Sequence, residues 1–305
     1  MNICIVGDPH DLTAVYVGWL ARRRGIEVIE LCEDKLGSEW YFEFDDEHLS
    51  EGTLYAAHSI HPFSAVSGAF VRLNPHPHLP EGIVLAPDDE AIFLVERRHS
   101  LQHFLNSAPF AVANRPAAGR GNSSKPYQMR SLASAGFRIP QWVVTNDASA
   151  ASEFESVYHR GMIYKSCSGL RSHVRRIDDE LMNRMSLGTS PVIIQEYIEG
   201  RDVRVHTVKS RFFPTEVLSS DVDYRFDGQD SEFRATGMPQ PLAERCCAYA
   251  KAEGLGVAGF DFRVTSDGNW YCLEMNPVPT FLPYEMATSQ RIGDAILDAL
   301  LSKPC

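Results

Sequence analysis

Residues 256–277, GVAGFDFRVTSDGNWYCLEMNP, constrain the fold of this chain more than any other stretch. Apolar and polar residues alternate on both sides of Ser-Asp-Gly-Asn, which is the pattern of two short β-strands joined by a turn. Asp-Gly between such segments is a strong signal for a two-residue hairpin turn, so we place the turn at Asp267-Gly268. Pairing outward from this turn sets Asp261 directly opposite Glu274, and Asn276 then shares the face of Glu274. The other face is expected to be apolar and to carry Phe260, Phe262, Val264, Tyr271, Leu273 and Met275.

The opposed carboxylates of this hairpin require an explanation, because like charges whose Cβ atoms lie roughly 5 Å apart repel each other. A cation between Asp261 and Glu274 would remove the conflict. Carboxylate and amide oxygens are hard donors, and Mg²⁺ usually takes one or two carboxylates together with phosphate oxygens. The face formed by Asp261, Glu274 and Asn276 is therefore a candidate platform for Mg²⁺ and a nucleotide. A hairpin whose polar face is only solvated accounts for the same pattern.

Composition restricts the classes of protein to be considered. A chain of 305 residues can form two or more domains around a sizeable core. The net charge of −11 argues against a nucleic-acid partner, and no apolar run is long enough to cross a membrane. Asp8 interrupts the first apolar run too early for a signal peptide. The seven cysteines lack a Cys-x-x-Cys pair, which indicates reduced thiols and a cytoplasmic protein.

The first third of the chain is typical of an open α/β domain. Asp11 can cap a first helix that Gly25 closes, and short apolar runs on either side of it predict parallel strands. Residues 108–122 are rich in Ala, Gly, Pro and Asn and mark a domain boundary. The expected elements are strands at 2–6, 28–31 and 69–73, a helix at 12–24, and a helix capped by Asp88 that runs to about 106.

The remainder alternates between strands and helices around three informative stretches. Ser124 can cap a helix that Gly136 closes. Residues 221–237 are polar and irregular, as in a mobile loop over a site. The other expected elements are a strand at 137–145, helices at 148–159 and 241–254, and a final amphipathic helix at 284–301 with Ile292, Ala295, Ile296 and Leu300 inward.

The stretch 162–177 carries a lysine beside a small loop. An apolar strand delivers Lys165 into Ser166-Cys-Ser168-Gly169, and a basic strand with Arg175 and Arg176 follows. Such a lysine can place a point charge against phosphates while the loop amides cover them. Considered alone, the stretch is better explained by a hairpin with a solvated basic edge.

The stretch 191–208 predicts a buried strand, a turn and a returning strand. Gln195 and Glu196 end the buried strand, where they suit hydrogen bonds to a planar base and a ribose. On the returning strand, Asp202, Arg204 and His206 share one face. The alternative is that this is the solvated face of an outer strand.

Five features of this sequence together resemble the ATP-grasp superfamily in order and spacing. They are Lys125, Lys165 with its loop, the Gln-Glu-Tyr-Ile-Glu-Gly segment at 195–200, Asp202-x-Arg204, and the hairpin residues Asp261, Glu274 and Asn276. The resemblance covers about 114–301, and residues 2–31 look like the open α/β domain that precedes it. It implies an α/β N-terminal domain followed by two α+β ATP-grasp subdomains. The implied bounds are 1–110 for the first domain, 111–190 for the central subdomain with the phosphate loop, and 191–305 for the C-terminal subdomain with the metal site.

The resemblance also implies ATP and Mg²⁺ as cofactors and assigns residues to them. Arg204 would stabilise the acyl phosphate or the oxyanion, and Arg263 is the second catalytic candidate. Asp261, Glu274 and Asn276 would ligate the metal. The implied nucleotide-binding residues are Lys125, Lys165, Ser166, Ser168 and Gly169 near the phosphates, Gln195, Glu196, Tyr197 and Ile198 at the adenine, Glu199 near the ribose, and Asp202.

Within the superfamily the chain looks most similar to the ribosomal-protein glutamate ligases and the microviridin-type (graspetide) peptide maturases. The likeness rests on Asp11-Leu-Thr-Ala, Asp202-Val-Arg204, Asp223-Tyr-Arg225 and Leu273-Glu-Met-Asn-Pro277. The maturases often carry aromatic-x-Arg-Arg where this chain has Phe70-Val-Arg72-Leu.

This branch implies an ATP-dependent carboxylate ligase that forms amide or ester bonds on a peptide through an acyl phosphate. The alternatives are a small-molecule amino-acid or dipeptide ligase and a nucleotide-binding regulator without catalysis. The expected partner is therefore a peptide or amino-acid substrate, with no nucleic acid and no membrane. Assembly into a homo-oligomer is left open.

Overall fold

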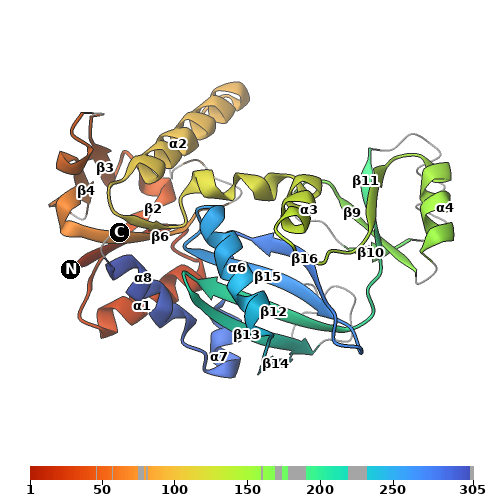
Figure 1. The fold of residues 1–305 in the computed structure, drawn as a ribbon. Helices are drawn as coiled ribbons and strands as arrows, with labels where there is room; N and C mark the ends of the chain where they lie inside the picture. Colours follow the sequence, from red (N-terminus) through yellow and green to blue (C-terminus); the bar gives the residue numbers. More distant parts are fainter. Residues whose placement is uncertain are drawn as a thin grey trace.

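The computed structural model describes residues 1–45, 47–56, 58–74, 79, 82–158, 161–168, 174–177, 190–218 and 232–302. Three larger β-sheets follow one another through the molecule, and a small antiparallel meander accompanies the first (Figure 1). In Figure 1 the N-terminal sheet lies on the left, the unit that contains α4 (Ala148–Val157) lies on the right, and the C-terminal sheet lies between them. The expected α/β domain followed by two α+β units is confirmed.

The N-terminal sheet is parallel, with the strand order β2-β1-β6-β7. The expected β-α-β opening is confirmed, and the side chain of Asp11 caps the first helix by accepting a hydrogen bond from the Ala14 amide. β7 pairs with β6 although it lies just beyond residue 110, the expected end of the first domain. The elements are β1 (Asn2–Gly7), α1 (Leu12–Arg23), β2 (Glu27–Cys32), β6 (Val66–Arg72) and β7 (Ala111–Ala113).

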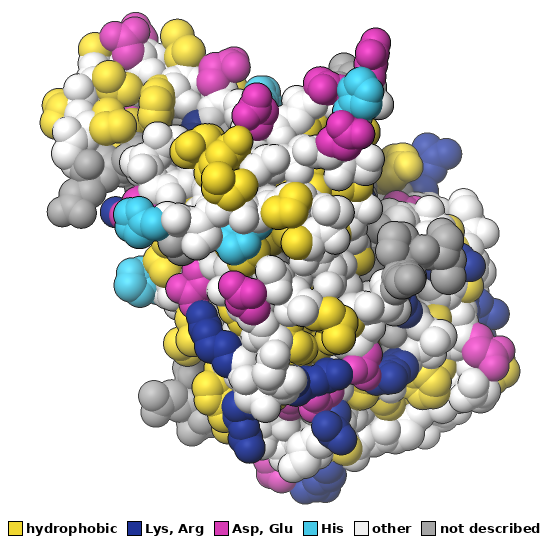
Figure 2. Space-filling view, turned by 90° about the vertical axis from the view of Figure 1, so that its left-hand side faces the viewer, with side chains coloured by type: hydrophobic (Ala, Val, Ile, Leu, Met, Phe, Trp, Pro, Cys, Tyr) yellow, Lys and Arg dark blue, Asp and Glu magenta, His cyan; other side chains and the backbone are white. Residues whose placement is uncertain are grey.

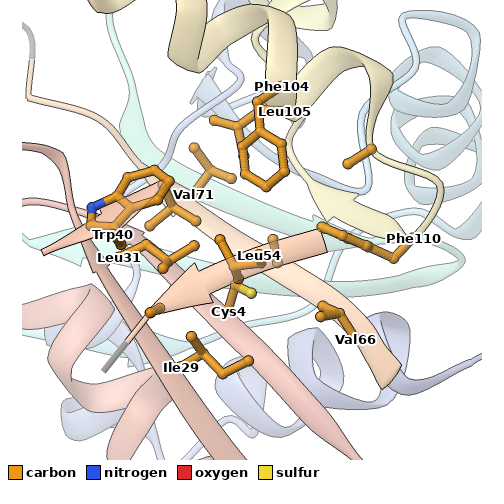
Figure 3. Packing of buried hydrophobic residues seen from close by; sticks show 14 of the residues in the cluster. Cys4, Ile29, Leu31, Trp40, Leu54, Val66, Val71, Phe104, Leu105 and Phe110 are labelled. Atoms are coloured by element: carbon orange, nitrogen blue, oxygen red, sulfur yellow. The ribbon is translucent and has the colours of Figure 1, made fainter. Parts of the chain in front are cut away.

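The meander lies between β2 and β6 in the chain and closes one face of the N-terminal core. Trp40 and Leu54 from the meander pack with Leu31 of the sheet and Phe104 of α2 (Figure 3). α2 begins at Pro87, so the expected cap at Asp88 is wrong, and Asp88 lies in the first turn. The elements are η1 (Glu33–Lys35), β3 (Trp40–Glu43), η2 (Leu49–Glu51), β4 (Thr53–Ala56), β5 (Ser59–Pro62), η3 (Phe63–Ala65) and α2 (Pro87–Ser107).

The central unit is an antiparallel sheet of order β10-β9-β11-β8. Ser124 caps α3 as expected, because its hydroxyl accepts a hydrogen bond from the Tyr127 amide. The expected strand at 137–145 is confirmed only for its second half, since Phe137 packs in the C-terminal core instead. The elements are η4 (Pro116–Ser123), α3 (Lys125–Ser134), β8 (Trp142–Thr145), α4, β9 (Met162–Ser166), β10 (Arg175–Arg176) and β11 (Val192–Glu196).

The C-terminal sheet is antiparallel, with the order β14-β13-β12-β15-β16. One face packs on α6 and on Phe137 in a core that includes Phe260 and Phe262. The expected irregular segment 221–237 is wrong at 232–235, which form an edge strand, and its first part lies outside the described residues. The elements are β12 (Arg201–Val208), β13 (Arg211–Leu218), β14 (Glu232–Ala235), α6 (Gln240–Ala252), β15 (Val257–Val264) and β16 (Trp270–Asn276).

The chain ends in two helices, α7 (Leu282–Thr288) and α8 (Ile292–Leu301), rather than in the single helix expected at 284–301. Ser289 adopts the left-handed conformation, with φ of 58°, and this ends α7. α8 then packs on α1 and on the N-terminal sheet (Figure 1). The four side chains expected to point inward from the last helix are all buried. Within the described ranges, no helix is both long and apolar enough to span a bilayer.

Candidate active site

The hairpin places Asp261 directly opposite Glu274, as the sequence predicts, and sets Asn276 opposite Gly259 on the same face. The turn differs from the expected two-residue Asp267-Gly268 turn. Val264 pairs with Trp270, and three residues form the loop between Thr265 and Asn269. Gly268 has a φ of 81°, which suits the left-handed position of such a loop.

A β-bulge between Asp261 and Phe262 restores the expected register farther from the turn. The one-residue error at the turn and the one-residue bulge therefore cancel at the carboxylate pair. Between the turn and the bulge the predicted strand pairing is wrong, because Cys272 rather than Leu273 lies opposite Phe262. Cys272 is buried in the core, whereas Tyr271 and Leu273 are half-buried.

Two arginine–aspartate ion pairs lie side by side on β12 and β15. Arg204 lies opposite Asp261, with Nη1 2.7 Å from Oδ2, and the two side chains are 6% and 12% exposed. Asp202 lies opposite Arg263, with Oδ1 3.0 Å from Nε. Gly259 leaves the space for the Arg204 guanidinium, because a Cβ atom at this position would collide with it. β12 is an inner strand, so the alternative of a solvated outer face is wrong.

Lys165 of the central sheet approaches this hairpin. The side chain is 5% exposed and lies on β9 opposite Ile193. Burial above all, and then Cys246, Asp261 and Glu274, raise the pKa of the Cys272 thiol well above its ordinary value, whereas Lys165 lowers it. The lysine and the two carboxylates therefore act on the same buried thiol, which places charges from both sheets in one region.

The structure also brings Lys125 to the small loop after β9. The Lys125 ammonium donates a hydrogen bond to the Ser168 carbonyl at 2.6 Å, and its amide donates to the Cys167 carbonyl at 3.0 Å. The Ser166 hydroxyl donates to the same Ser168 carbonyl at 3.3 Å. Gly169 lies outside the described residues. The N-terminus of α3 and the loop thus form one polar surface.

The end of β11 and the residues that follow it include those expected at the base and ribose. Gln195 is 2% exposed, and its Oε1 atom has no hydrogen-bond partner among the described residues. Glu196 accepts a hydrogen bond from the Gln141 amide at 3.3 Å. The ring of Tyr197 lies near two guanidinium groups, with its centroid 4.5 Å from Cζ of Arg176 and 5.9 Å from Cζ of Arg263. Ile198 is buried and Glu199 is exposed.

Two buried amides that the sequence analysis does not identify hold the ends of the hairpin. Gln128 donates to the Met275 carbonyl at 2.7 Å and accepts from the Met275 amide at 2.9 Å. Asn114 accepts from the amides of Gly256 and Val257 at 2.8 and 3.0 Å and also donates to the Pro277 carbonyl. Both fix backbone next to the candidate metal ligands, and neither belongs to a sequence motif that would have revealed it.

The loop that follows Asn276 is held from two sides. The Arg72 guanidinium pairs with Asp11 at 2.8 Å and donates to the carbonyls of Val278 and Pro279 at 3.0 and 3.2 Å. His206 is fully buried, and its Nε2 atom lies 3.2 Å from the Thr280 carbonyl. Burial, and then the nearby Arg204, lower the pKa of His206 well below its ordinary value, so the imidazole is neutral.

The hairpin face has the donor set that Mg²⁺ prefers. In the part of the chain that the structure describes, no three His, Cys, Asp or Glu side chains form a metal-binding group. Two carboxylates with one amide leave coordination positions for phosphate oxygens and water, which is the usual arrangement for Mg²⁺ beside a nucleotide. The residues present therefore fit this ion.

Solved structures with a similar fold cover almost the whole chain. The macrocyclase MdnC from Microcystis aeruginosa MRC, solved with its precursor peptide MdnA, matches with a TM-score of 0.82 at 20% identity over 99% of each chain. The ATP-grasp ligase PsnB, solved with a phosphomimetic variant of a minimal precursor, Mg and ADP, matches with a TM-score of 0.78 at 25% identity. That match covers 98% of this chain and 97% of PsnB. The match to MdnC establishes the fold.

Sequence comparison finds a D-alanine–D-alanine ligase from Synechococcus sp. (strain JA-3-3Ab), which is 25% identical over 170 residues. That alignment covers 48% of this chain and 52% of the relative, so the chain spans about half the length of the curated relative it matches. The family model of the ATP-grasp domain matches residues 122–280, just over half of the 305 residues. This range contains Lys125, Lys165 and the complete hairpin face. The chain belongs to the ATP-grasp family.

Proposed function

We propose that the protein is an ATP-dependent ligase that activates a carboxylate as an acyl phosphate and joins it to an amine or hydroxyl of a peptide. The observation that carries this proposal is the hairpin face, where Asp261 and Glu274 are opposed and Arg204 pairs with Asp261. Such a face suits the handling of phosphates, because Arg204 fixes Asp261 in place while Asp261, Glu274 and Asn276 present their oxygen atoms on one face.

Residues from the central and C-terminal sheets would bind different parts of ATP and its Mg²⁺. Asp261, Glu274 and Asn276 would hold Mg²⁺, which would neutralise phosphate charge when bound. Lys165, Lys125 and the loop at 166–168 would contact the phosphates, which is supported by the contacts of Lys125 and Ser166 with the Ser168 carbonyl. Gln195 offers an unpartnered acceptor to the amino group of adenine, as judged within the described residues. Tyr197 and Ile198 provide the adjoining apolar contact.

The reaction needs positioned charges rather than a protein nucleophile. An oxygen of the substrate carboxylate attacks the γ-phosphorus of ATP, the bond to the bridging oxygen breaks, and ADP leaves. The amine or hydroxyl then attacks the acyl carbon, phosphate leaves with the bonding electrons, and the proton of the nucleophile passes to solvent. Arg204 is held in place by Asp261 and stabilises the negative charge that develops on the acyl group. Arg263 orients Asp202 and the Gly200 carbonyl, so we assign it a positioning role.

A peptide is the favoured substrate because the similar structures MdnC and PsnB were solved with precursor peptides. The likeness to a D-alanine–D-alanine ligase supports the second candidate, ligation of free amino acids. The unpaired state of the six described cysteines and the use of ATP support action in the cytoplasm.

Intact-mass measurement tests the proposal. A precursor peptide encoded beside the gene is incubated with protein, ATP and Mg²⁺, and ADP is measured in parallel. Each ester or amide formed within the peptide should lower its mass by about 18 Da, with one ADP per bond. Addition of a free amino acid would raise the mass and favour the second candidate. ADP release with amino-acid pairs, together with an unchanged peptide, would refute the peptide substrate.

A further inference from the structure

The outer face of the N-terminal meander carries an exposed apolar row. Tyr41 of β3 pairs with Tyr55 of β4, and Tyr55 pairs with Ile60 of β5. Directly paired residues of antiparallel strands point to the same face, so these three side chains form one row across the meander. The two tyrosine rings stack with their centroids 4.4 Å apart. Tyr41 is 53% exposed and Ile60 is 69% exposed, so much of the row faces solvent.

This row forms one wall of a groove with a volume of about 860 Å³. Val15 and Gly18 of α1 and Leu31 of β2 also line the groove. Clefts that bind ligands usually measure about 300–1,000 Å³, so the groove has the size of a binding site rather than of a packing defect.

The groove leads to the candidate active site. It is lined at one end by Gly7 and Asp8, at the carboxyl end of β1. The Asp8 amide donates a hydrogen bond to the Arg72 carbonyl at 3.3 Å. The side chain of Arg72 contacts the loop at 278–280, which directly follows Asn276. These contacts link the groove to the loop that follows the proposed metal ligands.

The meander is acidic. Between Lys35 and Arg72 the sequence contains no lysine or arginine. Figure 2 shows that charges are also separated on this side of the molecule. Acidic and apolar side chains gather in its upper half, and most basic ones lie in its lower half. The six carboxylate residues of this stretch are Glu39, Glu43, Asp45, Asp46, Glu47 and Glu51.

We propose that this groove docks an extended segment of the peptide substrate in which aromatic or aliphatic residues alternate with lysine or arginine. The apolar side chains would cover the row of Tyr41, Tyr55 and Ile60. The basic ones would face the carboxylates that line the groove beside Arg22 and Lys35, which are Asp8, Glu30 and Glu39, within the wider acidic field of the meander. A second copy of the chain fits less well, because a symmetric contact through this face would bring two acidic meanders together. The proposal rests on the proposed function for the identity of the partner.

Fluorescence anisotropy tests the groove without catalysis. The probe is a fluorescein-labelled octapeptide that alternates lysine with phenylalanine and leucine, and its counterpart carries glutamate in place of lysine. Ile60→Ser removes the most exposed side chain of the row. Ile92→Ser is the matched control, because Ile92 is 63% exposed on α2 and does not line the groove. Equal melting temperatures establish that both variants are folded.

The basic probe should bind the unaltered protein and Ile92→Ser alike and should bind Ile60→Ser about tenfold more weakly. The acidic counterpart should not bind, and hydrogen exchange should slow at residues 53–62 when the basic probe is added. Equal affinity for Ile60→Ser and Ile92→Ser, or no binding at all, would overturn the docking site. A dimer that Ile60→Ser dissociates would assign the face to self-association and would also overturn it.

The two proposals fail separately. If the probe binds as expected while no peptide is ever modified, the groove stands and the proposed peptide ligation is wrong. If a precursor is modified but neither its KM nor the probe affinity responds to Ile60→Ser, the ligation stands and the groove is not its docking site.

Discussion

Carboxylates gather in two regions of this protein, and the two regions differ in how far these carboxylates are buried and in whether an arginine lies opposite them. On the C-terminal sheet, Asp202 and Asp261 are largely buried, and each lies directly opposite an arginine of the neighbouring strand. On the N-terminal meander, the carboxylates stand in a stretch without any lysine or arginine, and Glu39, Asp45 and Glu51 are exposed.

The difference follows from burial. A buried charge must have a partner in a fixed place, so the C-terminal face has little freedom and can position reacting groups. An exposed charge is screened by water and salt, and it acts mainly through the combined field that attracts a partner of opposite sign. This difference agrees with the two proposals, which put the chemistry on the C-terminal sheet and the capture of a partner at the meander.

Arg204→Ala should have the largest effect, because it removes the buried ion pair that Arg204 makes with Asp261 opposite Glu274. Loss of one partner from a buried pair typically lowers the free energy of unfolding by about 3–5 kcal/mol. Loss of a positioned donor should also lower turnover by about 10²-fold or more. Urea unfolding without nucleotide and single-turnover kinetics measure the two effects.

Arg201→Ala is the matched control on the same strand. Its guanidinium lies 3.3 Å from Glu216, and its side chain is 41% exposed. Exposed pairs contribute at most about 1 kcal/mol, so this variant should unfold almost like the unaltered protein. Equal destabilisation by the two substitutions would contradict the contrast between buried and exposed charges.

Lys165→Ala should weaken ATP binding by about tenfold or more, because it removes a buried cation from the phosphate region. Lys165→Arg should restore the affinity only in part, because a guanidinium presents its donors in a different geometry. Isothermal titration calorimetry with ATP measures both variants. Unchanged affinity in Lys165→Ala would exclude the residue from the nucleotide site.

His206→Gln should change the dependence of stability on pH. Since burial lowers the pKa of His206 below its ordinary value of 6.5, the unfolded chain takes up a proton below this pH and the native protein does not. The free energy of unfolding should therefore fall by at most about 1.4 kcal/mol for each pH unit below 6.5. Urea unfolding at pH values on both sides of 6.5 should show a smaller decline in the variant. Identical slopes would exclude His206 as the titrating group.

Glu51→Gln should have the smallest effect. Glu51 is exposed on the meander, and its neutralisation removes one of six carboxylates from a solvated surface. The affinity for ATP and the melting temperature should both remain unchanged. A clear loss of either would show that the charges of the meander serve stability or nucleotide binding rather than association.

Strong local patterns allowed the sequence to predict the hairpin and its opposed carboxylates. The alternation around Ser-Asp-Gly-Asn identifies both strands, and the cap at Asp11 identifies the first helix. The bulge beside Asp261 could not be predicted, because it depends on how Phe262 and Cys272 fill the core. The break at Ser289 was hidden for a related reason, since a non-glycine residue in the left-handed conformation gives no sequence signal.

The burial of Arg204 and His206 could not be derived from their own strand. Alternation predicts which residues share a face, but whether that face is covered depends on segments far along the chain, since the Thr280 carbonyl and the Tyr284 ring of α7 lie against His206. The same holds for the meander, whose row of Tyr41, Tyr55 and Ile60 exists only once three short strands are paired. Contacts between distant segments thus decided most of what the sequence left open.

Calorimetric titration of a non-hydrolysable ATP analogue at increasing Mg²⁺ tests the central assignment most directly. Glu274→Gln removes one charge from the hairpin face without changing its shape, and Glu51→Gln removes one from the meander. If the hairpin holds Mg²⁺, Glu274→Gln should weaken Mg²⁺-dependent binding at least about tenfold, while Glu51→Gln should bind like the unaltered protein. Equal affinity of all three proteins at every Mg²⁺ concentration would contradict the account.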